Sequence, residues 1–139
     1  AHNPAGFRGL TKFVSKLPNK YRTVVMTVPG DRRDDDIREM GEIAGNAFDR
    51  IVIRHGHYLR GRDPNEVTIL LQEGIARTGK EPQVRVIPHG RDAIHHAVKN
   101  GRKGELVVTL ADLVPQDIQY VQEIRDKLLE EQQQAESEQ

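Results

Sequence analysis

Hydrophobic positions along the chain follow two alternating periods. Over about residues 5–17 they recur every three or four positions, which is typical of an amphipathic helix, and Pro18 and Asn19 end it. Short runs rich in Val, Ile and Thr, each of which predicts a buried strand, occupy residues 23–28, 51–53, 84–87 and 106–110. Helical spacing returns over residues 34–48, 63–78 and 90–99 and from Pro115 onward. The predicted order is therefore α-β-α-β-α-β-α-β-α.

This alternation predicts the fold class. Strands that alternate with helices form parallel sheets through right-handed crossovers, with helices on both faces. We therefore expect an α/β fold, a single Rossmann-like doubly wound domain that covers residues 1–129. Residues 130–139 are rich in Gln and Glu and lack a large apolar side chain, so a polar tail, either a frayed helix or disordered, is expected there.

Local residue types support two of the predicted helix starts. Asp63 can cap a helix that has Pro64 at its first position, and Glu66 can reach back to the amide of the cap. The run Asp34-Asp35-Asp36 lies at the start of another helix, where negative charge complements the helix dipole.

Composition narrows the class of function. The 139 residues suffice for one core, and Lys plus Arg equals Asp plus Glu at 21 each, which argues against a nucleic-acid partner. The absence of cysteine excludes disulfides, thiolate zinc sites and cysteine nucleophiles. No apolar run approaches the roughly 20 residues of a membrane span and no signal peptide opens the chain, so no membrane partner and a cytoplasmic location are expected.

Candidate chemistry gathers where the predicted strands end. In an open parallel sheet, ligands bind beyond the carboxyl ends of the strands. The four loops there cover residues 29–34, 54–62, 88–92 and 111–114, and the first three are dense in Gly, Arg, Asp and His.

The first of these loops contains Asp31, Arg32 and Arg33 after Gly30, which permits a tight turn. Guanidinium forks suit carboxylates and phosphates, so the two arginines are candidate substrate-binding residues. They can equally well pair with the three aspartates that follow, and the sequence leaves both interpretations open.

The second loop carries Arg60-Gly61-Arg62, whose two guanidinium groups can point into one pocket and bind a carboxylate. The alternative is a solvated basic loop. No H-x-x-x-H or H-E-x-x-H spacing occurs, and the adjacent His95 and His96 diverge on a helix, so no metal ligand is assigned. No Ser lies on a nucleophile elbow, so no catalytic residue is assigned either.

Phosphate-binding motifs are absent from the sequence. Neither G-x-x-x-x-G-K-[ST] nor G-x-G-x-x-G occurs. If a nucleotide takes part in the function, its phosphates are held mostly by something outside this chain.

Four segments with distinctive residues follow one another along the chain, namely Ala1–Pro4, Gly30–Ile37, Leu59–Arg62 and Gly90–Ile94. Together they resemble the C-terminal domain of the Mur-ligase superfamily, and most of all its cyanophycin-synthetase branch. The start, Ala1-His2-Asn3-Pro4, is similar to the second half of that family's Asp-Tyr-Ala-His-Asn-Pro motif, whose acidic residue would lie upstream. The resemblance spans about residues 1–125 and keeps the order of the motifs.

The resemblance implies a peptide-type ligase. ATP would phosphorylate a carboxylate, which releases ADP, and the amine of an incoming amino acid would attack the acyl phosphate to form an amide with loss of phosphate. ATP and Mg²⁺ would be held mainly by an upstream central domain of the same polypeptide, with His2 and Asn3 near the nucleotide. Arg60 and Arg62 would hold the α-carboxylate of the amino acid, which is arginine by this analogy. Asp31 or a neighbouring aspartate would hold its guanidinium.

The same resemblance implies that arginine is joined to an aspartate side-chain carboxylate, that this domain is inactive alone, and that a homo-oligomer is compatible with the intact enzyme. Three alternatives remain open. One is a muropeptide or folylpolyglutamate-type ligase domain, which the Arg-Arg-Asp loop disfavours. The second is a non-catalytic scaffold within a related synthetase, and the third is a stand-alone anion-binding protein.

Overall fold

A computed structural model describes residues 3–57, 59–110 and 114–137. The described helices are α1 (Pro4–Ser15), α2 (Asp34–Ala47), α3 (Pro64–Ala76), α4 (Gly90–Lys99) and α5 (Val114–Ser137). The described strands are β1 (Arg22–Met26), β2 (Arg50–Ile53), β3 (Gln83–Val86) and β4 (Leu106–Thr109). The predicted element order is confirmed, and the predicted boundaries differ from these by no more than a few residues.

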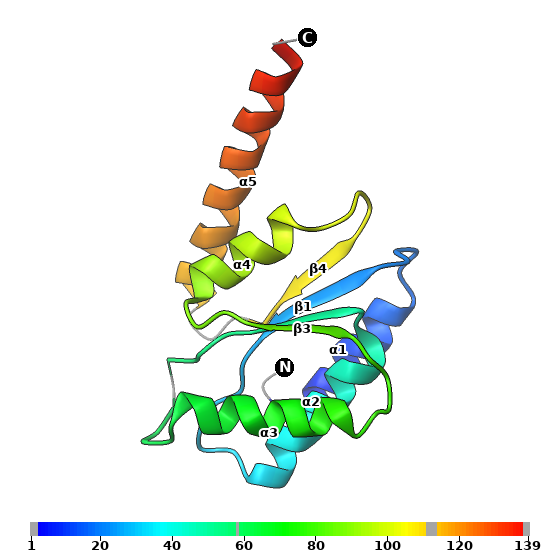
Figure 1. The fold of residues 1–139 in the computed structure, drawn as a ribbon, viewed down its shortest axis with the longest axis vertical. Helices are drawn as coiled ribbons and strands as arrows, with labels where there is room; N and C mark the ends of the chain where they lie inside the picture. The colour runs from blue at the N-terminus through cyan, green and yellow to red at the C-terminus, as the bar shows by residue number, and fades with distance from the viewer. Residues whose placement is uncertain (1–2, 58, 111–113, 138–139) are drawn as a thin grey trace.

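The four strands form one sheet in the order β3-β2-β1-β4, and every neighbouring pair is parallel. Helices α1, α2 and α3 lie on one face of the sheet, and α4 and α5 lie on the other (Figure 1). This arrangement confirms the predicted doubly wound α/β fold. The carboxyl ends of all four strands consequently meet at one edge of the sheet.

Two apolar cores lie on the two faces of the sheet. The larger packs β1 and β2 against α1, α2 and α3, and Phe7 of α1 stacks on Phe48 with ring centroids 6.3 Å apart. The smaller packs Val25 and Val52 of the sheet against α4 and against Ile124 of α5.

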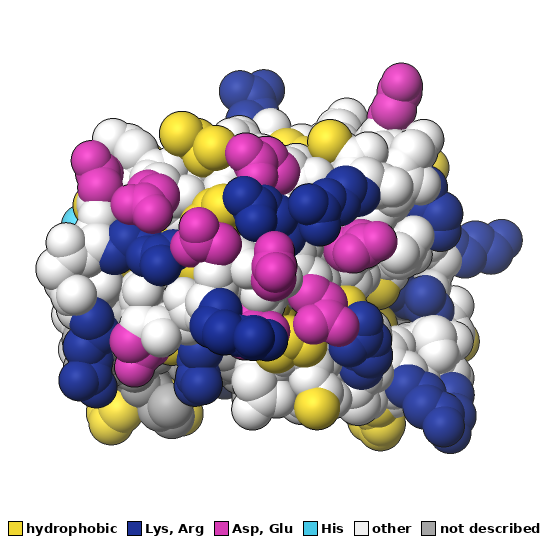
Figure 2. Space-filling view, turned by 90° about the horizontal axis from the view of Figure 1, so that it is seen from below, with side chains coloured by type: hydrophobic (Ala, Val, Ile, Leu, Met, Phe, Trp, Pro, Cys, Tyr) yellow, Lys and Arg dark blue, Asp and Glu magenta, His cyan; other side chains and the backbone are white. Residues whose placement is uncertain are grey.

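Glycines allow helices α2 and α3 to approach closely. A Cβ atom on Gly41 would lie 2.2 Å from the carbonyl oxygen of Leu71, and one on Gly74 would lie 1.9 Å from that of Arg38. Ion pairs cross the outer surface, and Figure 2 shows cationic and anionic side chains interspersed there. Arg38, for example, bonds both Asp35 and Glu73. The mixed signs make this a solvated face.

Helix α5 is longer than its packing surface. Its first half lies along α4, and its second half projects beyond the domain (Figure 1). Ile124 is buried, whereas Ile118, Val121 and Leu129 are 51%, 41% and 49% exposed. The predicted boundary between residues 1–129 and 130–139 stays a prediction, since α5 is one helix up to Ser137. Within the described ranges, no helix has the length and apolarity that crossing a bilayer requires.

The helix start predicted at residue 63 is only partly as expected. The side chain of Asp63 accepts a hydrogen bond from the amide of Asn65, which confirms the cap, and Pro64 is the first residue of α3. The carboxylate of Glu66 does not reach back to the amide of Asp63 as predicted. It lies 3.7 Å from Arg62 instead.

Candidate functional site

Two loops that follow β1 and β2 are in direct backbone contact at the carboxyl edge of the sheet. A Cβ atom on Gly30 would lie 1.9 Å from the carbonyl oxygen of Leu59, so only glycine fits this position. The sequence suggested Gly30 for a tight turn. In the structure its main role is to let the loop after β1 touch the loop after β2.

A tight turn shapes the second loop. The amide of Arg62 donates to the carbonyl of Leu59 at 3.0 Å, and Arg60 and Gly61 between them have φ angles of 52° and 83°. Arg60 is thus the one described non-glycine residue with a positive φ. Positive φ is costly for a non-glycine residue and is often associated with function. The turn sends the side chains of Arg60 and Arg62 toward different acidic partners.

Arg62 is held firmly by the first turn of α2. Its Nη1 donates to Oδ1 of Asp34 at 2.7 Å, Glu66 lies nearby, and the Arg62 side chain is only 21% exposed. Such a short, partly buried, charge-assisted bond is strong for its type. It ties the start of α2 to the second loop.

Arg60 is held loosely by comparison. Its Nε lies 3.9 Å from Oδ2 of Asp31, and the two side chains are 67% and 48% exposed. Exposed pairs with this geometry contribute little stability, about 0–1 kcal/mol. Arg60 and Asp31 therefore offer two opposite charges, side by side and open to an exchange of partners.

Arg33 and Arg32 differ in their surroundings. Arg33 donates to both carboxylate oxygens of Asp36, at 3.2 and 3.3 Å, and the hydrogen bond to Asp36 raises the pKa of the Arg33 guanidinium. Of the two interpretations that the sequence left open, Arg33 thus follows the one in which it pairs with a following aspartate. Arg32 is exposed and forms no ion pair with any described residue.

The two residues predicted to lie near a nucleotide give little information. His2 lies outside the described residues. The Oδ1 atom of Asn3 accepts from the amide of Gly6 at 2.8 Å and so caps α1. No group of three or more His, Asp or Glu side chains suited to a metal ion occurs within the described parts of the chain. The described residues alone therefore do not supply a set of ligands for Mg²⁺.

The observed fold agrees with comparisons to known proteins. Residues 1–113 match the profile of the family described as Mur ligase, glutamate ligase domain. The chain belongs to this family. Two cyanophycin synthetases, from Synechocystis sp. and Nostoc sp., are 35% and 31% identical over 87% and 99% of the chain. A UDP-N-acetylmuramoyl-L-alanyl-D-glutamate–2,6-diaminopimelate ligase from Alkaliphilus metalliredigens is 28% identical over 78% of it.

A solved structure of a UDP-N-acetylmuramoyl-L-alanyl-D-glutamate–2,6-diaminopimelate ligase has the same fold as this Mur ligase domain. It superposes with a TM-score of 0.67 at 21% identity, over 78% of this chain and 22% of that one. The superfamily resemblance and the similarity to cyanophycin synthetases are thereby confirmed. This Mur ligase domain spans 14% to 15% of the length of the two cyanophycin synthetases.

Sequence patterns did not single out the buried cation beneath the loops of this Mur ligase domain. Arg54 directly follows β2, and its side chain is fully buried. Its Nη2 donates to the carbonyl of Leu110 at 2.9 Å and lies 3.5 Å from Oδ2 of Asp117, which is also buried. Arg54 therefore ties β2 to the end of β4 and to the first turn of α5. An arginine directly after a buried strand was the available signal.

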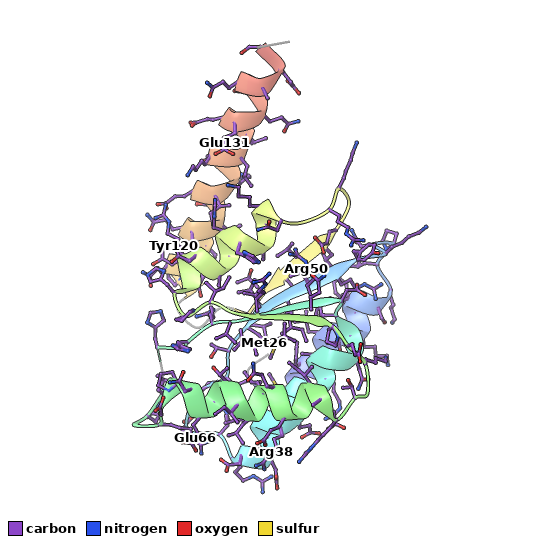
Figure 3. The ribbon with its side chains drawn as sticks, in the orientation of Figure 1. Met26, Arg38, Arg50, Glu66, Tyr120 and Glu131 are labelled. Carbon is purple, nitrogen blue, oxygen red and sulfur yellow. The ribbon has the colours of Figure 1, made fainter. Side chains whose placement is uncertain are left out.

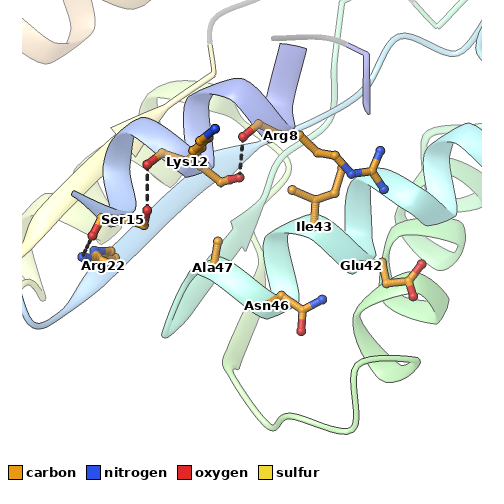
Figure 4. Close-up of a pocket in the computed structure, with 9 residues that line it drawn as sticks. Arg8, Lys12, Ser15, Arg22, Glu42, Ile43, Asn46 and Ala47 are labelled. Carbon is orange, nitrogen blue, oxygen red and sulfur yellow. Dashed lines mark hydrogen bonds between the residues drawn. The ribbon is translucent and has the colours of Figure 1, made fainter. Parts of the chain in front are cut away.

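One hollow among the described residues of the Mur ligase domain lies away from these loops. It measures about 600 Å³ and is lined by α1, β1 and α2 (Figure 4). Its lining includes Arg8, Lys12, Arg22 and Glu42 and none of the predicted substrate-binding residues. The candidate site at the carboxyl edge of the sheet is therefore separate from this hollow.

Proposed function

We propose that this domain is the substrate-side domain of an ATP-dependent ligase that forms amide bonds by way of an acyl phosphate. In this proposal ATP and Mg²⁺ are held mainly by a central domain of the same polypeptide. The observation that carries the proposal is the contact of Gly30 with Leu59, since it sets Asp31 beside Arg60 at the carboxyl edge of the sheet. Membership of the Mur ligase family supports the class of reaction.

We propose arginine as the incoming amino acid, joined to the side-chain carboxylate of an aspartate. Free arginine carries a carboxylate and a guanidinium, which are the two charges that Arg60 and Asp31 already present to each other. Because the Arg60–Asp31 pair is long and exposed, arginine can replace it at little cost, with its carboxylate on Arg60 and its guanidinium on Asp31. Similarity to cyanophycin synthetases supports this choice.

The other arginines have supporting roles in this proposal. Arg62 keeps its short bond to Asp34 and so fixes the loop that carries Arg60. Arg33 stays with Asp36, and Arg32 is left for an acidic acceptor or for a phosphate. This divides the predicted substrate-binding residues into those that contact ligands and those that position the loops.

The test uses the full-length protein that contains this domain, because the domain alone is not expected to be active. ADP release is measured in the presence of ATP, Mg²⁺ and an aspartate-containing acceptor peptide, with arginine, lysine, 2,6-diaminopimelate or glutamate as the amino acid. Arg60→Ala should raise the KM for arginine about 10- to 100-fold, the loss expected for a hydrogen bond to a charged group. Arg77→Ala, which removes an exposed arginine at the end of α3, is the matched control.

Each outcome of this test separates the alternatives. An unchanged KM for arginine in Arg60→Ala would remove Arg60 from the site. Release of ADP only with 2,6-diaminopimelate would favour the muropeptide alternative. No release with any amino acid would favour a scaffold without catalytic activity.

A further inference from the structure

A second polar hollow lies at the opposite edge of the sheet from the substrate loops. It measures about 240 Å³ and is bounded by the amino-terminal ends of β2 and β3 and by the last turn of α4. Polar side chains line it, namely Arg50, Gln83, Arg85, His96, Asn100 and Arg102. No residue proposed to bind the amino acid lies in this hollow.

The topology of the sheet explains why the hollow stays open. Gln83 and Arg85 alternate along the edge strand β3 and point to the same face, since Val84 between them packs into the core on the other face. Figure 3 shows Arg50 on the α4 side of the sheet and Met26 on the opposite side. Helix α4 lies over β1, β2 and β4, so the α4 side of β3 is left as the open wall.

Positive charge predominates in the hollow, because none of the residues that line it is acidic. Arg50 is neutralised by Glu105, whose carboxylate it bonds with two nitrogens, at 3.2 and 3.1 Å. Arg85 and Arg102, by contrast, form no ion pair with any described residue. Arg102 lies over the ring of Tyr21, with its guanidinium carbon 3.9 Å from the ring centroid, which is a cation–π contact.

The pKa of His96 is affected by the excess of positive charge in the hollow. Burial lowers the pKa of this histidine, and the positive charges of Arg85 and Arg50 and the neighbouring His95 lower it further. The Asn100 side chain bonds the His96 backbone carbonyl at 2.9 Å and so shields the exposed end of α4. Two exposed guanidinium groups that form no ion pair with a described residue, those of Arg85 and Arg102, therefore line the hollow beside the partly buried His96.

We propose that this hollow is a binding site for a phosphate group, separate from the site of amide-bond formation. Two uncompensated guanidinium forks match the charge and the oxygen geometry of a phosphate dianion better than those of a single carboxylate. The phosphate is either inorganic phosphate or the end of a polyphosphate chain such as that of a nucleotide. The competing explanation is that Arg85 is a solvated charge that protects an edge strand from aggregation.

The test measures ligand-dependent amide hydrogen exchange on the full-length protein. Inorganic phosphate, tripolyphosphate and sodium chloride of equal ionic strength are compared, and peptides that cover residues 83–86 and 96–105 are followed. We expect slower exchange in these peptides with phosphate or tripolyphosphate and no change with chloride. The relative affinities of the two phosphates then tell which source the site prefers.

Variants decide whether the arginines cause the effect. Arg85→Gln should weaken phosphate binding about tenfold, and Arg102→Gln should do so too, because each removes one charge-assisted contact. Arg77→Gln is the matched control and should bind as the wild type does. Three results would overturn the proposal. Chloride could slow exchange as much as phosphate does, neither phosphate could slow exchange, or the slowing could persist unchanged in Arg85→Gln and Arg102→Gln. In Arg60→Ala, whose KM for arginine should rise, the protection by phosphate should be unchanged, which separates the two sites.

Discussion

Replacement of Gly30 by alanine is the sharpest single test of the loop arrangement. The added Cβ would lie 1.9 Å from the carbonyl oxygen of Leu59, and the next nearest atoms are also backbone atoms of Leu59. Backbone cannot rotate out of the way as the end of a side chain can. The two loops must therefore move apart until the contact is ordinary.

The size of this movement follows from the contact distances. Ordinary van der Waals contacts of a Cβ begin at 3.4 Å, so the loops must separate by about 1.5 Å. Displacement of a substrate-binding group by about 1 Å can reduce activity roughly 100-fold. We therefore expect Gly30→Ala to lower kcat/KM for the amino acid about 100-fold and to cost about 1–3 kcal/mol of stability, as overpacking does.

Two other glycines supply matched controls. A Cβ on Gly9, in the exposed part of α1, would have nothing within 4 Å, so Gly9→Ala should stabilise the protein by about 0.5–1 kcal/mol without an effect on activity. A Cβ on Gly74 would lie 1.9 Å from the carbonyl of Arg38, which is the same overlap as at Gly30 but in the α2–α3 interface. Gly74→Ala should thus destabilise the protein with a smaller loss of kcat/KM.

The assay combines initial rates of ADP release by the full-length protein with amide hydrogen exchange of the two loops. In Gly30→Ala, peptides that cover residues 29–34 and 59–62 should exchange faster than in the wild type, while peptides of α1 should not. Wild-type kcat/KM together with unchanged exchange in both loops would refute the proposed contact between Gly30 and Leu59.

Two further predictions concern buried charges. Glu105→Gln should destabilise the protein by about 3 kcal/mol at neutral pH because it leaves the Arg50 guanidinium, 15% exposed, without its partner. Burial raises the pKa of Glu105, but hydrogen bonds from the Arg102 amide and from Arg50 outweigh it, so the net pKa lies below 4.5. The stability due to this low pKa is present above about pH 4.5 and is lost as the pH falls through the folded pKa. The thermal unfolding temperature of Glu105→Gln should therefore depend less on pH in that range than that of the wild type. An unchanged pH dependence would contradict this. Asp117→Asn should lower the stability of the protein by about 3 kcal/mol because Arg54 is buried beside Asp117. Amide hydrogen exchange at the start of α5 should become faster in this variant. Exchange there at the wild-type rate would argue against the Arg54–Asp117 pair.

The course of the chain could be predicted from the sequence because periodicity reports burial. The apolar runs at Val24 and Ile51 lie in a sheet buried on both faces, where a continuous apolar strand is expected. Helix α5 shows the limit of this argument. Its apolar positions at Ile118 and Val121 have the spacing of a buried stripe, yet both are exposed, because α4 covers only part of that face. Period alone does not tell which part of a stripe finds a neighbour.

The edge of the sheet at which the two loops lie could be predicted from the sequence, but the pairing of their side chains could not. Strand order placed the loops after β1 and β2 at one edge, and Arg60 and Asp31 are indeed neighbours there. The pairing of Arg62 with Asp34 depends on how closely the second loop approaches the start of α2. The close contact at Gly30 and the positive φ of Arg60 determine this approach. These are three-dimensional quantities, and no spacing along the chain encodes them.

The arrangement of charges also suggests how one domain combines a rigid frame with an exchangeable surface. Arg54 lies fully buried beneath the loops, and Arg62 is fixed to Asp34 by a bond of 2.7 Å, so both resist rearrangement. The Arg60–Asp31 pair lies above them at 3.9 Å in solvent, where breaking it costs little. A ligand with both charges can therefore replace the exposed pair without disturbing the buried ones. This is the physical reason for the proposal that Asp31 and Arg60 contact the substrate and that Arg62 positions the loop.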